Sequence, residues 1–244
     1  MGHNYGSPLT ILFTFLMASG SYMFARAKTF TIVNDCKETV WPGIITHSDN
    51  FSGGGFALKP GQSAVYNAPA GWSGRIWART GCNFSHDTGT GTCQTGSCGT
   101  QLNCTGPSSP PNTIAEITVG GDTDFYDVSL VNGFNLPIYI LPLKGKGNCS
   151  IAGCDGDLRQ SCPSQLAVKE NGTVIACKSA CDEFDTDEYC CRGSYADPAV
   201  CKPTNYSMSF KQVCPAASSY ALDDRSTIIA CSGSEYIVAF CASR

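Results

Sequence analysis

Several residue types and motifs are scarce in this chain of 244 residues, and each scarcity argues against a class of function. Only three histidines are present, so few residues could act as the base of a Ser-His-Asp triad. No C-x-x-C pair occurs, although zinc ribbons and thioredoxin-like redox sites need one. Neither G-x-x-x-x-G-K-[ST] nor G-x-G-x-x-G appears, and nucleotide phosphates therefore have no recognisable cradle. These absences predict a protein without a metal or another cofactor.

Charge is also sparse, since Asp, Glu, Lys and Arg make up 15% of the residues and the formal net charge is −4. No basic stripe is present, which argues against nucleic acid as a partner and against attraction to anionic membranes. Charge-driven attack on membranes is disfavoured for the same reason.

Long apolar runs are confined to the first 27 residues. Leu9–Ala18 has the length of a signal-peptide core, and Ala25-Arg26-Ala27 offers a small-x-small cleavage pattern. A membrane anchor is the alternative, but the run is too short to cross about 30 Å of hydrocarbon. We therefore expect a signal peptide over 1–27, a mature chain from Lys28, and a secreted protein without a transmembrane segment.

Cysteine, by contrast, is abundant, with sixteen residues from Cys36 onward. An even count at this density in a secreted chain predicts a disulfide framework. Eight bridges use every thiol and leave none for nucleophilic chemistry. Each bridge contributes about 2–4 kcal/mol in the chain-entropy account, because it restricts the unfolded chain. The residues alone do not choose among the possible pairings.

The secondary-structure pattern is that of a mainly β protein. Short β-rich runs alternate with Gly, Pro, Asn and Ser clusters, which predicts an antiparallel sandwich or barrel. The expected strands are Thr29–Val33, Val40–Ile45, Ala64–Asn67, Arg75–Arg79, Ile114–Val119, Phe125–Val131, Ile138–Leu141 and Tyr236–Phe240. Two cysteine-rich blocks interrupt them: a loop region between Thr80 and Pro111, and the segment from Cys154 to Cys214.

The second cysteine-rich block holds the helical signals. Tyr206, Phe210 and Val213 recur at helical spacing and predict a helix of about ten residues. Asp185, with Glu188 three residues later, predicts the capping box of one short turn.

Strand alternation places a few polar side chains together. Period-two pleating puts Arg75, Glu116 and Asp127 on polar strand faces. If the three strands are neighbours, a guanidinium and two carboxylates converge, which suits acid–base work on a glycosidic bond or hydrogen bonding to sugar hydroxyls. The pattern alone favours the plainer interpretation, that these are ordinary solvated strand faces.

Longer motifs resemble those of the thaumatin-like proteins, the fifth family of plant pathogenesis-related proteins. They are GTGTCQTGSCGTQLNC at 89–104, PPNTIAE at 110–116, DFYDVSLVNGFN at 124–135, YCC at 189–191 and CP at 214–215. The likeness covers residues 28–244 and includes the order of the sixteen cysteines.

The resemblance implies a mainly β fold: a flattened antiparallel β-sandwich core with two smaller disulfide-rich loop and helix domains. It divides the mature chain into a central sandwich domain of 28–79, 111–155 and 215–244, a stapled loop domain of 80–110, and a disulfide-rich domain of 156–214 with short helices. It also implies eight disulfides: Cys36–Cys241, Cys82–Cys93, Cys98–Cys104, Cys149–Cys231, Cys154–Cys214, Cys162–Cys177, Cys181–Cys190 and Cys191–Cys201.

The resemblance further implies an acidic cleft between the sandwich and the Cys154–Cys214 block, lined by one Arg, one Glu and three Asp. Four positions match by motif: Arg75, Glu116, Asp127 and Asp223. Adjacent Asp224 is the fallback for the last of them. Asn132 stands at the remaining aspartate position, and Ser97 replaces an Asp of the family signature. The cleft is therefore expected to be less acidic than the family pattern and still able to hydrogen-bond a glycan.

Three functions follow from the resemblance. The first is a plant defence protein that binds β-1,3-glucan of fungal cell walls in the cleft and acts against fungi. The second is a weak endo-β-1,3-glucanase, with Glu116 as the acid and Asp127 as the nucleophile or base. The third is an inhibitor or a membrane-perturbing antifungal protein. We favour binding.

The expected location is the extracellular space, or apoplast, and the expected state is a monomer. The end at Arg244 lacks the extension that some family members use for vacuolar delivery. A glycoprotein is also expected, because N-x-S/T sequons begin at Asn50, Asn83, Asn103, Asn148, Asn171 and Asn205. Those at Asn103 and Asn148 have a cysteine in the middle position and are the poorer acceptors.

Overall fold

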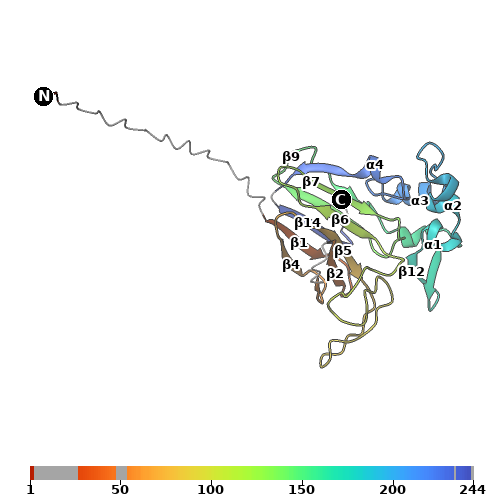
Figure 1. The fold of residues 1–244 in the computed structure, drawn as a ribbon. Coiled ribbons are helices and arrows are strands. Elements are labelled where there is room, and N and C mark those ends of the chain that lie inside the picture. The colour runs from red at the N-terminus through yellow and green to blue at the C-terminus, as the bar shows by residue number, and fades with distance from the viewer. Residues whose placement is uncertain (3–26, 48–53, 234, 243–244) are drawn as a thin grey trace.

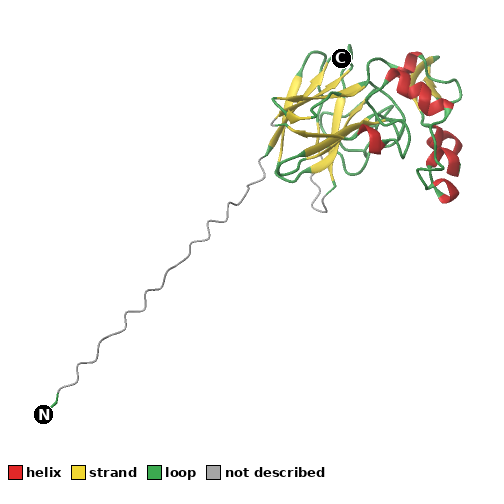
Figure 2. Ribbon diagram, turned by 90° about the horizontal axis from the view of Figure 1, so that it is seen from above, coloured by secondary structure: helices red, strands yellow, loops and turns green. Residues whose placement is uncertain are grey.

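Strands dominate the computed structural model, which describes residues 1–2, 27–47, 54–233 and 235–242 (Figure 1). Two sheets face each other, and a group of short helices lies to one side of them (Figure 2). The predicted signal region from 3 to 26 and the sequon at Asn50 lie outside the described residues. No helix of the described part is long and apolar enough to cross a membrane.

The first sheet has five strands in the order β10-β8-β14-β1-β4. Their bounds are Lys28–Asn34 (β1), Ser63–Ala68 (β4), Ile138–Leu143 (β8), Ala152–Gly153 (β10) and Glu235–Phe240 (β14). Every second residue of β1 is buried, as period-two pleating requires. β1 pairs with β14 in parallel, whereas the other pairs of this sheet are antiparallel. A parallel pair needs a long crossover, and the chain between these two strands supplies it.

The second sheet has seven strands in the order β3-β2-β5-β6-β7-β13-β9, all paired antiparallel. Their bounds are Trp41–Thr46 (β2), Gly54–Gly55 (β3), Ser73–Arg79 (β5), Ile114–Thr118 (β6), Asp124–Ser129 (β7), Lys146–Gly147 (β9) and Ile229–Ser232 (β13). The eight predicted strands are present, and each end lies within two residues of the predicted one. β13 was not predicted, because four residues beside a polar segment carry too little alternation.

Aromatic side chains fill part of the space between the two sheets. The Phe30 ring lies 5.4 Å from Trp72 and 5.7 Å from Tyr236, measured between ring centroids, and Tyr236 lies 5.6 Å from Tyr126. Such pairs contribute about 0.5–1.5 kcal/mol beyond the area that they bury. The Tyr236 hydroxyl donates to Asp124 over 2.5 Å, and burial together with this carboxylate raises the pKa of Tyr236.

The remaining elements form what we call the helix lobe, apart from α4, which lies beside β7. They are Leu158–Gln160 (η1), Ala167–Glu170 (β11), Thr173–Cys177 (β12), Ala180–Phe184 (α1), Asp187–Cys190 (α2), Gly193–Tyr195 (η2) and Asn205–Val213 (α3), and α4 is Asp224–Thr227. The predicted helix over Tyr206, Phe210 and Val213 is confirmed as α3. Thr204 caps α3, and its capping box is completed by Ser207.

The predicted capping box at Asp185 and Glu188 is wrong by one residue. The N-cap of α2 is Thr186, whose hydroxyl accepts a hydrogen bond from the Tyr189 backbone. Asp185 instead ends α1 in the left-handed conformation, with φ 50°. Aspartate tolerates that conformation better than most residues, which makes Asp185 a helix end rather than a helix start.

Eight disulfides cross-link the fold, and the described chain has no free cysteine. Every pair is the one that the family resemblance implies: Cys36–Cys241, Cys82–Cys93, Cys98–Cys104, Cys149–Cys231, Cys154–Cys214, Cys162–Cys177, Cys181–Cys190 and Cys191–Cys201. Three of these bridges close short loops within the helix lobe, whereas Cys154–Cys214 spans 60 residues of chain around it.

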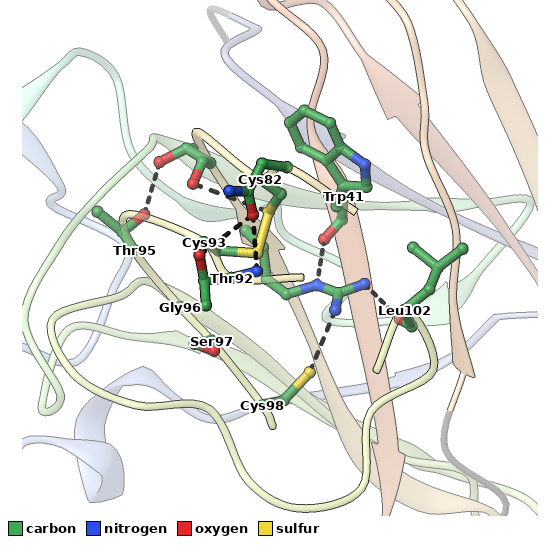
Figure 3. Close-up of a disulfide and its surroundings, with 12 residues drawn as sticks. Trp41, Cys82, Thr92, Cys93, Thr95, Gly96, Ser97, Cys98 and Leu102 are labelled. Carbon is green, nitrogen blue, oxygen red and sulfur yellow. Dashed lines mark hydrogen bonds between the residues drawn. A yellow bond between two sulfur atoms is a disulfide. The ribbon is translucent and has the colours of Figure 1, made fainter. Parts of the chain in front are cut away.

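A buried arginine holds the loop region 80–110 against the sheet. The Arg79 guanidinium is fully buried and donates to the backbone carbonyls of Trp41 and Leu102, at 3.0 and 2.7 Å (Figure 3). It also points toward the sulfur of Cys98 and lies 5.0 Å from the centroid of the Phe84 ring. Burial lowers the pKa of Arg79 to about 10. Strand alternation puts Arg79 on the same face of β5 as Arg75, and the structure agrees. The loop region 80–110, however, covers this end of the face.

Candidate functional site

Three polar side chains lie in one row across the seven-stranded sheet. Arg75 on β5 pairs in register with Glu116 on β6, and Glu116 pairs in register with Asp127 on β7. The Arg75 Nε donates to Glu116 Oε1 over 2.6 Å, and the two side chains are 35% and 25% exposed. Residues directly opposite on neighbouring strands have Cβ atoms about 4.5–5.5 Å apart. The strand order that the alternation required is therefore present, and it brings these three predicted residues together.

Asp127 is the most deeply placed of the three, with only 6% of the residue exposed. The hydroxyl of Ser218 donates to Asp127 Oδ2 over 3.2 Å and also contacts the hydroxyl of Thr227 at 2.5 Å. The Ser218 backbone is itself bonded to β7 through Val128 and Leu130. The carboxylate is thus held by a residue that the sequence analysis did not identify, from a segment about ninety positions away.

Asp223 lies beside this row and is engaged elsewhere. Lys211 Nζ on α3 donates to Asp223 Oδ2 over 2.8 Å, and the Ser219 backbone and hydroxyl donate to the same oxygen at 2.9 and 3.0 Å. Burial by itself raises the pKa of Asp223, but the hydrogen bonds from Lys211 and Ser219 outweigh it and lower that pKa. The Thr227 hydroxyl lies 3.4 Å from the Asp223 carbonyl and 2.5 Å from the Ser218 hydroxyl, which brings Asp223 close to the residue that contacts Asp127.

Asn132 and Asp224 complete the predicted set. Asn132 is half-buried just beyond the end of β7, and its carbonyl accepts a hydrogen bond from the Asn112 backbone over 3.0 Å. Asp224, the fallback for Asp223, begins α4, and its side chain lies outside the described part of the structure.

The polar row continues along the same strand faces. Ser73 and Thr118 are paired in register, with 2.9 Å between their hydroxyl oxygens, and His47 Nδ1 lies 3.3 Å from the Ser73 hydroxyl. Two apolar side chains accompany them: Phe125 on the face of Asp127 and Ile228 just before β13, which are 47% and 49% exposed. Phe125 and Asp127 are two residues apart on β7, so strand alternation places both on this face, but nothing local in the sequence shows that the Phe125 ring stays exposed.

A groove of about 410 Å³ is lined in part by His47 and Ser73, and two more cavities lie on the helix-lobe side of this row. One of about 90 Å³ lies between Val131 and Tyr220 on one side and α1, α2 and α3 on the other. A larger groove of about 630 Å³ lies within the lobe and shares Tyr189 and Tyr206 with it. Neither is lined by Arg75, Glu116 or Asp127. These three side chains therefore form a partly open face rather than the wall of either cavity.

The chemistry available at this face is hydrogen bonding with fixed charges. It offers two carboxylates as acceptors, a guanidinium as a donor, and hydroxyl groups that do both. Among the described residues, no group of three or more His, Cys, Asp or Glu side chains is placed to hold a metal ion.

Comparisons with known proteins agree on one family. A model of the thaumatin family matches residues 34–242. Pathogenesis-related thaumatin-like protein 3.5 of Cryptomeria japonica is 50% identical over 222 residues, which cover 90% of this chain and 92% of that protein. Pathogenesis-related protein 5 of Arabidopsis thaliana is 49% identical over 238 residues, which cover 96% of this chain and 98% of that protein.

Solved structures add a likeness in three dimensions. The thaumatin-like xylanase inhibitor TLXI superposes with a TM-score of 0.50 and 27% identity, covering 87% of this chain and 99% of that one. A laminaripentaose-producing β-1,3-glucanase in complex with laminaritetraose gives a TM-score of 0.58 at 11% identity, over 87% of this chain and 98% of that one. The second likeness shows a shared fold alone, because the identity is so low.

Proposed function

This chain belongs to the thaumatin family of pathogenesis-related defence proteins, and from that premise we propose that it is a secreted, extracellular antifungal protein that binds β-1,3-glucan of fungal cell walls. The binding surface is the face of β5, β6 and β7 that carries Arg75, Glu116 and Asp127. One observation carries the proposal: these three side chains stand in register on adjacent strands. In the domain division that we also propose, this face lies where the central domain (28–79, 111–155 and 215–244) borders the domain of 156–214.

Fixed polar groups suit a neutral polysaccharide. Each sugar hydroxyl both donates and accepts a hydrogen bond, so a surface that presents both kinds of partner satisfies it. The Arg75–Glu116 pair and the Ser218–Asp127 contact fix the carboxylates before any ligand arrives. Preorganisation of this kind lowers the ordering cost of binding. The exposed Phe125 ring on the same face supplies apolar surface for the C–H faces of the sugar.

The test is a binding isotherm of the purified protein with laminarin, repeated over a salt series. We expect saturable binding that changes little with moderate salt, because screening acts on charge pairs and β-1,3-glucan is uncharged. Absence of binding to any β-1,3-glucan would reject the proposal. That outcome would favour inhibition of a microbial glycoside hydrolase, since a xylanase inhibitor shares the fold at 27% identity.

Slow hydrolysis of the same glucan is the second candidate, and one observation favours it. Glu116 and Asp127 face each other in register, which places two carboxylates side by side, and glycoside hydrolysis uses a pair of carboxyl groups. The Arg75 contact weighs against it, because a general acid needs a proton to donate whereas Glu116 accepts a hydrogen bond from a cation. A reducing-sugar assay on linear β-1,3-glucan, run beside the isotherm on one preparation, separates the two candidates.

A further inference from the structure

We propose that the larger groove of the helix lobe is a second binding subsite for the same β-1,3-glucan chain, an inference that rests on the proposed function. We call it the tyrosine groove. It has a volume of about 630 Å³, and its aromatic lining comes from Tyr189 on α2, Tyr195 on η2 and Tyr206 on α3. This volume falls within the range of about 300–1,000 Å³ that is typical of small-molecule sites.

Two of the three rings are held in place from behind. The Tyr189 and Tyr206 rings meet edge to face, with centroids 5.7 Å apart and an interplanar angle of 72°. Phe184 backs both of them, at 5.2 and 5.3 Å. Tyr195 enters from a separate turn, without a ring contact to this trio among the described residues. The groove is thus a preformed aromatic surface, with one ring that can be removed without unpacking the others.

Unused hydrogen-bonding groups surround these rings. Within the described part of the chain, no protein group hydrogen-bonds to the hydroxyl of Tyr189, Tyr195 or Tyr206. Glu188 and Lys202 line the groove and contribute one formal charge of each sign, which cancel. A site with rigid aromatic surface, free hydroxyls and no net charge suits an uncharged ligand that is apolar on its ring faces and polar at its edges. A neutral pyranose has that character.

The position of the groove selects a glucan chain as the occupant. The small cavity of about 90 Å³ shares Tyr189, Lys202 and Tyr206 with the groove. On its other side it is lined by Val131, next to Asn132, and by Tyr220, whose carbonyl accepts from the backbone of Asp223. The small cavity therefore lies between the tyrosine groove and the residues beside Asn132 and Asp223, which adjoin the proposed glucan-binding face without belonging to its row. A linear polymer long enough to pass that cavity contacts both the groove and the face.

The experiment measures affinity against chain length for linear β-1,3-glucan oligomers and laminarin. For the wild-type protein, affinity is expected to rise again once the oligomer is long enough to reach the groove. Tyr195→Ala is expected to remove that increment, about tenfold for a lost ring contact, while leaving short-oligomer affinity unchanged. Tyr195→Phe, which keeps the ring, should retain most of the increment. Tyr139→Ala, at a half-buried tyrosine of β8 in the other sheet, is the matched control and should behave as wild type.

The outcomes are distinct. If Tyr195→Ala folds normally by circular dichroism and binds every oligomer as wild type does, the groove is not a subsite, although the proposed function stands. If affinity of the wild-type protein does not depend on length beyond the shortest binder, the groove is likewise excluded. If no oligomer and no laminarin binds to wild type, the proposed function fails, and the second subsite fails with it.

Discussion

Replacement of Glu116 by glutamine distinguishes binding from hydrolysis. Glutamine has the same shape, so its amide oxygen still accepts from Arg75 Nε, which lies 2.6 Å from Glu116 Oε1. What is lost is one negative charge on a side chain that is 25% exposed. A charge-assisted hydrogen bond is roughly twice as strong as a neutral one, whose net worth is about 1 kcal/mol. Glucan affinity is therefore expected to fall by about fivefold at most.

The same substitution is expected to lower the rate of hydrolysis much more than it lowers glucan affinity. A positioned general acid contributes about 10²- to 10⁴-fold to the rate, and glutamine cannot donate that proton. Any release of reducing ends by the wild-type protein is thus expected to fall by at least about 100-fold in Glu116→Gln. Calorimetric titration with laminarin and a reducing-sugar assay on the same samples give the two numbers.

The chain offers a matched control for this substitution. Glu183 pairs with Lys178 over 2.9 Å in the helix lobe, and the two side chains are 32% and 38% exposed. Glu183→Gln removes the same charge from a similar pair away from the proposed face, and both readouts should stay at wild-type values. If Glu116→Gln folds normally yet loses affinity and hydrolysis by the same large factor, the assignment of separate roles is refuted.

Three further predictions concern what holds the face in place. Arg79→Lys should lower the free energy of unfolding by about 2–4 kcal/mol and speed proteolysis of 80–110, because one ammonium cannot reach carbonyls that a planar guanidinium spans. Urea denaturation measures this, with a substitution at an exposed arginine, Arg192→Lys, as the control. Equal stability of the two variants would contradict the prediction. The lowered pKa of Asp223 means that this carboxylate stabilises the fold above its unfolded pKa of about 3.9, and that the contribution is lost as pH falls through the folded pKa. In urea melts over a pH series, Asp223→Asn should be less stable than wild type at neutral pH, and its stability should depend less on pH below about pH 4. An unchanged slope of stability against pH in that range would count against the Lys211 pair. The double replacement of Cys154 and Cys214 by alanine opens a loop of 60 residues and should lower the free energy of unfolding by about 4 kcal/mol. The measurement is the midpoint of thermal unfolding, which should fall. A midpoint equal to that of wild type would show that the lobe docks without this bridge.

The row of Arg75, Glu116 and Asp127 was predictable because strand alternation is a local property. A period-two pattern with one buried face fixes the side of the sheet on which each side chain lies. The sequence alone did not show that the three strands are neighbours, and the strand register of the structure shows that they are. Arg79 shows the limit: it has the same parity as Arg75, yet it is fully buried, and Cys98 and Leu102 of the loop region 80–110 contact it from about twenty positions further along the chain.

Other features depend on contacts that no short window contains. Lys211 and Asp223 meet only when α3 docks, and Ser218 reaches Asp127 from 91 residues away. The hairpin β11–β12, by contrast, had a local signal, since Asn171-Gly172 both adopt positive φ, at 48° and 80°, and this dipeptide is a strong hairpin turn. The helix cap was missed by one position because Asp185 and Thr186 are both good cap residues.

The parallel pairing of β1 with β14 has a consequence for biosynthesis. β14 is the central strand of its sheet, and the Cys36–Cys241 bridge beside this pair spans 205 residues of chain. At about 5–20 residues per second, a ribosome needs about 10–40 s to make that stretch. During this time the apolar residues of β1 lack the neighbour that completes their sheet. Nascent chains of this protein are therefore expected to need protection by chaperones until β14 has emerged.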